Sequence, residues 1–128
     1  MTQEEKDLLL KDLCARLYTG TMVNYNDIEG CDYELTIRTL SNFPEEKLKC
    51  YLRPMSSMTE EEKEEYYATG NVVWDNETYI APVLDVFEMT DKTFDWLNKN
   101  KFDYRGLIEK GLALEAPEDM YKEKLIRI

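Results

Sequence analysis

The chain of 128 residues contains no histidine, and this absence removes the side chain that most often transfers protons near neutral pH. Histidine is also a common zinc ligand, and the three cysteines, Cys14, Cys31 and Cys50, include no Cys-x-x-Cys pair. We therefore expect no metal site and no cofactor. The odd number and wide spacing of the cysteines favour free thiols in a reducing compartment over a disulfide framework.

Long apolar runs are also missing, because none approaches the roughly 20 residues that span a bilayer. The first five residues, MTQEE, are acidic where a secretory signal would be basic and then apolar. We expect a cytoplasmic protein that does not enter a membrane. The glycine-containing motifs of nucleotide-binding loops and of hydrolase nucleophile elbows are absent as well, so the chain is predicted not to be an enzyme and no catalytic residue is assigned.

Acidic side chains are abundant: 27 Asp and Glu against 16 Lys and Arg give a formal net charge of −11. Because such a charge repels phosphate, we expect no direct binding of nucleic acid. The length is typical of one domain, and 43% hydrophobic residues supply material for a core. No linker, repeat or low-complexity stretch divides the chain. We predict a single α+β domain over residues 1–128.

Three helices are predicted from their first residues. Thr2 with Glu5 forms a capping box and precedes a helix of about four turns that ends before Gly20. A second capping box at residues 59–62 begins a helix that ends before Gly70, and Thr90 or Asp91 begins a third that runs to about residue 100. The apolar stripe of the first helix is predicted to consist of Leu9, Leu10, Leu13, Cys14 and Leu17.

Alternating apolar and polar residues predict strands at 22–25, 33–38 and 47–52. We expect these strands to form a three-stranded antiparallel meander that packs against the N-terminal helix. The expected fold is therefore α+β, with a small antiparallel sheet of three or more strands, an N-terminal helix and further short helices.

Later segments are less regular in pattern. A short helix over residues 104–110, capped by Asp103, and a strand over 112–114 are expected. Residues 71–89 allow a hairpin with arms at 72–74 and 79–81, limited by Pro82, and residues 83–87 allow either a strand or a turn of helix. Residues 120–128 allow a helix, a strand or a frayed tail.

Three segments of the chain have distinctive sequences: 11–17 (KDLCARL), 51–62 (YLRPMSSMTEEE), and a third that runs from 94–100 (FDWLNKN) through 102–108 (FDYRGLI) to 115–117 (EAP). In these segments the chain resembles a group of small uncharacterised proteins of gut Bacteroidales and of their phages and mobile elements. The chain departs from this group at Lys101, where its members often carry His, and near Tyr18, where a Pro is missing. The group has no known activity, so the resemblance implies an accessory protein of a bacterium or phage and no catalytic residue.

The best candidate for a recognition surface lies between residues 51 and 67, where aromatic, Met and Arg side chains adjoin five glutamates within six positions. Trp74 and Trp96 extend this group. In the alternative interpretation the methionines anchor the loop on the protein's own core, and the glutamates are the solvated first turns of a helix. The predicted partner-binding residues are Tyr51, Arg53, Met55, Met58, Glu60, Glu61, Glu62, Glu64, Glu65, Tyr66 and Tyr67.

The leading functional hypothesis is a non-enzymatic interaction protein, accessory or regulatory, that binds an unidentified protein partner through an acidic and aromatic surface. Mimicry of nucleic acid by the dense carboxylates is one form of this hypothesis. A small carboxylate-based enzyme, with Asp95 and Asp103 as its acid and base, is the first alternative. A virion-associated structural protein is the second.

Overall fold

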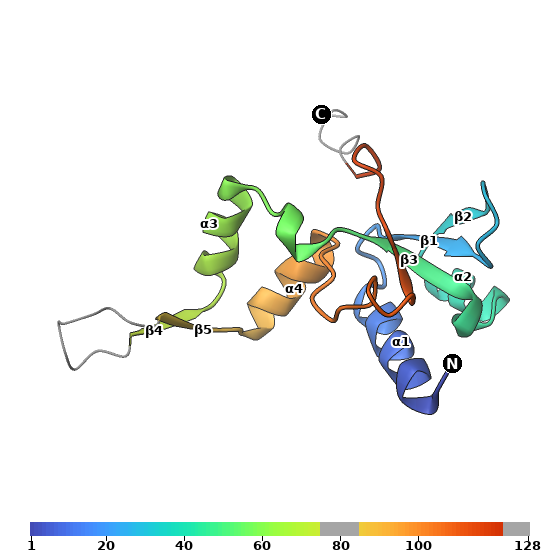
Figure 1. The fold of residues 1–128 in the computed structure, drawn as a ribbon, viewed down its shortest axis with the longest axis horizontal. Coiled ribbons are helices and arrows are strands. Elements are labelled where there is room, and N and C mark those ends of the chain that lie inside the picture. Colours follow the sequence, from blue (N-terminus) through green and yellow to red (C-terminus); the bar gives the residue numbers. More distant parts are fainter. Residues whose placement is uncertain (75–84, 122–128) are drawn as a thin grey trace.

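A computed structural model of the chain describes residues 1–74 and 85–121. It confirms the α+β class, because a four-stranded, mostly antiparallel sheet packs against an N-terminal helix and is accompanied by further short helices. The sheet, helix α1 and helix α2 gather at one end of the molecule, and helices α3 and α4 with a two-stranded hairpin gather at the other (Figure 1).

Helix α1 spans Gln3–Ala15 and begins as predicted. The Thr2 hydroxyl accepts a hydrogen bond from the Glu5 amide at 3.1 Å, and the Glu5 carboxylate accepts one from the Thr2 amide at 3.0 Å. This reciprocal pair satisfies two amides that a helix start otherwise leaves without partners. The helix has about the predicted four turns, but it ends at Ala15 and not at Gly20.

The buried face of α1 differs from the predicted stripe. Leu9 and Leu13 are buried as expected, but Leu10 and Cys14 are exposed and the charged Asp12 is fully buried. The prediction for Leu10 and Cys14 is therefore wrong. The helix is rotated toward Asp12 because partners elsewhere in the chain satisfy that carboxylate, as described below.

The strand order of the sheet is β2-β1-β3-β6, with β1 at Met22–Tyr25, β2 at Asp32–Glu34, β3 at Leu48–Leu52 and β6 at Ala113–Glu115. Strand β1 is antiparallel to both of its neighbours, and β6 is parallel to β3. The predicted meander order is wrong, because β1 and not β2 occupies the middle. Every residue of β2 is exposed, which suits an edge strand, whereas β1 and β3 bury side chains.

The strand predicted over 33–38 stops at Glu34, and helix α2 spans Ile37–Asn42. The Thr36 hydroxyl accepts a hydrogen bond from the Thr39 amide and so begins this helix. Of the three apolar residues that suggested a strand, only Leu35 enters the core, and Ile37 is 52% exposed. A 3₁₀ helix, Glu45–Lys47, then leads into β3.

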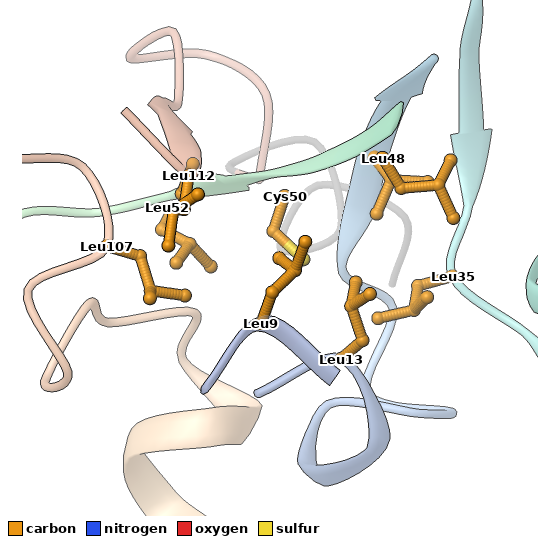
Figure 2. Packing of buried hydrophobic residues seen from close by; sticks show 10 residues of the cluster. Leu9, Leu13, Leu35, Leu48, Cys50, Leu52, Leu107 and Leu112 are labelled. Carbon is orange, nitrogen blue, oxygen red and sulfur yellow. The ribbon is translucent and has the colours of Figure 1, made fainter. Parts of the chain in front are cut away.

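The main core lies between α1 and the sheet. In Figure 2, Leu9 and Leu13 of α1 point toward Cys50 and the leucines of the sheet and loops. Each element has one apolar face, because apolar residues recur at i and i+4 in the helix and at alternate positions in β3. These two faces meet in the core. The buried members are Leu9, Leu13, Val23, Leu35, Leu48, Cys50, Leu52, Leu107, Leu112 and Ala113.

A parallel pair of strands needs a long crossover, and here it carries most of the remaining elements. Between β3 and β6 lie a 3₁₀ turn at Met55–Ser57, helix α3 at Glu60–Ala68, strands β4 at Asn71–Trp74 and β5 at Asp85–Glu88, and helix α4 at Asp91–Lys99. A second, smaller hydrophobic cluster of Met58, Leu97 and Phe102 holds this crossover together.

Strands β4 and β5 pair antiparallel, so the second arm of the hairpin is β5. For the segment 83–87 this favours the strand over residues 85–87. Residues 79–84, including Pro82, lie outside the described residues, as do 122–128 of the C-terminal tail.

The helix expected over 104–110 is wrong, because the chain forms successive turns there. The Asp103 carboxylate accepts hydrogen bonds from the amides of Leu107 and Ile108, which ties the loop to itself without a helix. Strand β6 confirms the short strand expected near residue 113. Within residues 1–74 and 85–121, no helix has the length and apolar character that crossing a membrane requires.

Candidate functional site

The predicted partner-binding segment, residues 51–67, runs from strand β3 through the 3₁₀ turn into helix α3, and its side chains fall into three groups. Met58 is buried. The partly buried residues are Tyr51, Arg53, Met55, Glu62 and Tyr66, and the exposed residues are Glu60, Glu61, Glu64, Glu65 and Tyr67.

Helix α3 carries the exposed acidic side chains and buries no residue at all. Its start is the predicted one: the Thr59 hydroxyl accepts from the Glu62 amide at 3.2 Å, and the Glu62 carboxylate accepts from the Thr59 amide at 3.0 Å. Acidic side chains in the first turn interact favourably with the positive end of the helix dipole. Glu60 is 90% exposed and pairs with Lys63 at 3.2 Å, which leaves the outer side of α3 strongly acidic.

Glu62 differs from the other glutamates because it pairs inside the protein. Both of its carboxylate oxygens accept from the Arg53 guanidinium at 2.7 Å, and the two side chains are only 26% and 18% exposed. Arg53 lies 4.2 Å from the centroid of the Phe102 ring, and one of its nitrogens also donates to the Asn100 carbonyl at 3.4 Å. The hydrogen bonds from Arg53 hold the pKa of Glu62 below its usual range.

Aromatic side chains link α3 to α4. Tyr66 lies 5.9 Å from Trp96 between ring centroids, and Trp96 stacks on Phe102 at 5.6 Å. Tyr67, 5.5 Å from Tyr66, is 52% exposed. The side chain of Trp74, which the sequence groups with these residues, lies outside the described part of the chain. Aromatic packing therefore fixes the inner side of α3 and presents Tyr67 beside the glutamates.

The two methionines pack on the protein's own core, whereas Tyr67 is exposed. Met58 belongs to the second hydrophobic cluster, and Met55 packs against that cluster while remaining partly exposed. Both contacts agree with the interpretation in which the loop anchors on the protein's own core.

Tyr51 lies in the sheet and not on the crossover. Its hydroxyl donates to Asp32 at 2.7 Å, and its carbonyl accepts from the Tyr121 hydroxyl, which in turn accepts from the Met22 amide. The β1–β3 ladder ends at the pair of Val23 and Cys50, and Met22 and Tyr51 are the next residues on the two strands, so the Tyr121 hydroxyl bridges β1 and β3. Burial and the carboxylate of Asp32 raise the pKa of Tyr51 to about 12.

The carboxylates proposed for catalysis are in different environments. Asp95 is exposed on α4, whereas Asp103 is buried and already accepts two backbone amides. Among the described residues, no three Cys, Asp or Glu side chains are arranged to hold a metal ion. Burial raises the pKa of the Cys50 thiol, which favours its unreactive protonated form.

A buried ionic network escaped the sequence analysis. Asp12, which is fully buried, accepts from Arg16 at 2.9 Å and from Arg105 at 2.8 Å. Arg16 is also fully buried, donates to the Phe102 carbonyl at 2.7 Å, and lies 5.4 Å from the centroid of the Tyr104 ring. These contacts join α1 to the loop after α4. Sequence offers one signal: Asp12 and Arg16 lie three and seven residues after Leu9, on the same helix face.

Comparison of the chain with protein-family models, with curated proteins and with solved structures finds no match in any of the three.

Proposed function

We propose that this protein is a non-enzymatic accessory protein that binds a basic protein partner through the outer side of helix α3. The observation that supports this proposal is that α3 buries no residue and exposes four of its five glutamates next to Tyr67. A helix that served only to complete the core would bury an apolar stripe.

Charge gives the chemistry of the partner. The net charge of −11 and the concentration of carboxylates on α3 favour a segment rich in Lys and Arg, because opposite potentials steer association. Tyr67 adds an amphipathic ring of the kind enriched in binding hot spots. The same charge opposes direct binding of nucleic acid. The proposed setting is the cytoplasm of a gut bacterium, where the protein serves a phage or mobile element.

The experiment compares two variants that lose the same charge. In the first, the four exposed glutamates of α3 become Gln, and Glu62 is left in place because it pairs with Arg53. In the control variant, four exposed glutamates elsewhere become Gln. The control positions are Glu29, Glu46, Glu109 and Glu118.

A partner captured from host lysate and then purified is mixed with each variant at about 50 and 200 mM salt, and both rate constants are measured. We expect the α3 variant to associate at least tenfold more slowly at low salt, with a much smaller change in the control, because steering is screened beyond about 10 Å. Tyr67→Ala should mainly raise the dissociation rate. Equal slowing by both variants would mean that the overall charge acts and α3 is not the binding surface.

A further inference from the structure

Helix α3 is too short and too solvated to be stable alone. It has nine residues and no buried side chain, and isolated helices of fewer than about 12 residues are marginal in water. Something outside the helix must therefore hold it in place. The described contacts that do so lie mainly at its two ends, with Tyr66 against Trp96 between them.

The C-terminal end of α3 is tied to the start of α4 by threonines. The Thr69 hydroxyl donates to the Thr93 hydroxyl at 3.0 Å, and the Thr90 hydroxyl donates to the Thr69 carbonyl at 2.7 Å. Thr93 is fully buried. These bonds join the end of α3 to the start of α4, and in the sequence the strands β4 and β5 lie between the two helices. This end is suited to act as a hinge.

The N-terminal end is held by an ion pair. Arg53 is itself fixed, because its amide donates to the Lys101 carbonyl at 2.7 Å and its carbonyl accepts from the Asp103 amide at 2.8 Å. Its guanidinium is therefore presented to Glu62 from a rigid position at the end of β3. Glu62 belongs to the first turn of α3 and also accepts from the Thr59 amide, so one carboxylate joins the cap of the helix to the sheet.

We infer that Arg53 and Glu62 form a latch that holds the N-terminal end of α3, and that α3 opens as a unit about the Thr69–Thr90 end when this pair separates. Opening carries the exposed glutamates of α3 with the helix and separates Tyr66, which belongs to α3, from Trp96 and from the second hydrophobic cluster. Short elements with few buried contacts are the ones that open before the whole protein unfolds. The latch does not depend on the proposed partner.

The chain supplies a matched pair of variants. Glu62→Gln removes the charge from the latch, but Gln at this position still supports a capping box. Glu60→Gln removes the same charge from the same helix and breaks the pair with Lys63. The side chains of Lys63 and Glu60 are 48% and 90% exposed, respectively. Exposed pairs of this kind contribute little to stability. The difference between the two variants therefore isolates the latch.

Amide hydrogen exchange is measured at low urea concentrations, where local opening depends less on urea than global unfolding does. In the wild type, the amides of α3 should exchange at least tenfold faster than those of β1 and β3, with a shallower dependence on urea. Glu62→Gln should speed exchange in α3 at least tenfold and Glu60→Gln less than threefold. Equal effects of the two variants, or one common rate and urea dependence for α3 and the sheet, would overturn the inference.

Arg53→Lys tests the other half of the pair, because a lysine keeps the charge but cannot contact both carboxylate oxygens in the same fork. If Arg53 and Glu62 form the latch, each single variant removes the same interaction. Amide exchange in α3 of the double variant, Arg53→Lys with Glu62→Gln, should therefore be no faster than in whichever single variant exchanges faster. Additive acceleration in the double variant would show that Arg53 and Glu62 act separately.

Discussion

Replacement of Asp12 by Ala should destabilise the protein more than loss of an exposed carboxylate on the same helix would. The Asp12 carboxylate is fully buried and accepts from Arg16 and Arg105. Removing one member of a buried ion pair typically costs about 3–5 kcal/mol, because the remaining charge has no counterion. Arg105 is 15% exposed and regains some water, but Arg16 has no exposed side-chain area. Of the described residues, only the Phe102 carbonyl would still accept from Arg16.

The size of the effect is estimated against Asp7→Ala on the same helix. Asp7 is exposed, and Ala gains about 0.5 kcal/mol of helix propensity at both positions, so this gain cancels in the comparison. We expect Asp12→Ala to lower the free energy of unfolding by about 3 kcal/mol relative to Asp7→Ala. With a urea slope of about 2 kcal/mol per M, the unfolding midpoint falls by about 1.5 M. A difference below about 1 kcal/mol would refute the argument, since it would mean that Arg16 finds other partners.

A second comparison separates charge burial from loss of packing. The double variant Asp12→Leu with Arg16→Met removes both fully buried charges of the network. Arg105 loses its partner, but its side chain is 15% exposed and reaches solvent. Apolar replacement of a whole buried pair is often nearly neutral. The double variant should therefore be more stable than Asp12→Ala, as measured by the same urea titration.

Three further predictions concern the cap of α3, the titration of Tyr51 and the effect of metal ions. Thr59→Ala should lower the free energy of unfolding by about 1 kcal/mol through loss of the helix cap, and an unchanged urea midpoint would contradict the importance of that cap. Because the folded pKa of Tyr51 is raised from 10.0 to about 12, stability should be full below pH 10 and decline toward pH 12; Tyr51→Phe should flatten that decline in pH-dependent unfolding. Thermal melting curves with excess chelator, zinc or calcium should coincide, and a chelator-induced drop of several degrees would reveal a metal site.

Local signals in the sequence predicted the starts of elements well. The capping boxes at Thr2 and Thr59 are confirmed because all of their hydrogen bonds lie within four residues. Strand β3 is confirmed because its alternate residues Leu48, Cys50 and Leu52 are buried. In each case the information that decides the structure is contained in the segment itself.

Tertiary contacts decided the features that the sequence analysis missed. Asp12 is buried because Arg105, 93 residues away, meets its carboxylate, and no local pattern contains that contact. The strand expected to continue past Glu34 gives way to α2 because only Leu35 finds a place in the core. The central position of β1 likewise depends on which strands bury both faces, and this is a property of the assembled sheet.

The partner-binding prediction combined residues with different physical roles. Composition placed Arg53, Met58 and Glu60 in one group, because Arg, Met and acidic residues side by side are typical of an interface. In the structure Met58 is buried, Arg53 pairs within the chain, and Glu60 is exposed. Only exposure and pairing, which need coordinates, separate a side chain that contacts a partner from one that holds the helix in position.

The capping boxes of α1 and α3 show how one local motif takes on two roles. In α1 the Glu5 carboxylate bonds to Thr2, and these hydrogen bonds lower its pKa, while Leu9 and Leu13 anchor the helix in the core. Helix α3 has no such buried anchor, and there the equivalent carboxylate of Glu62 also accepts from Arg53. The ion pair therefore attaches the N-terminal end of α3, and the partly buried Tyr66 is the apolar contact nearer its C-terminal end. Because α3 buries no residue completely, separation of the ion pair and of the Tyr66–Trp96 contact exposes less apolar surface than movement of α1, with its buried Leu9 and Leu13, would.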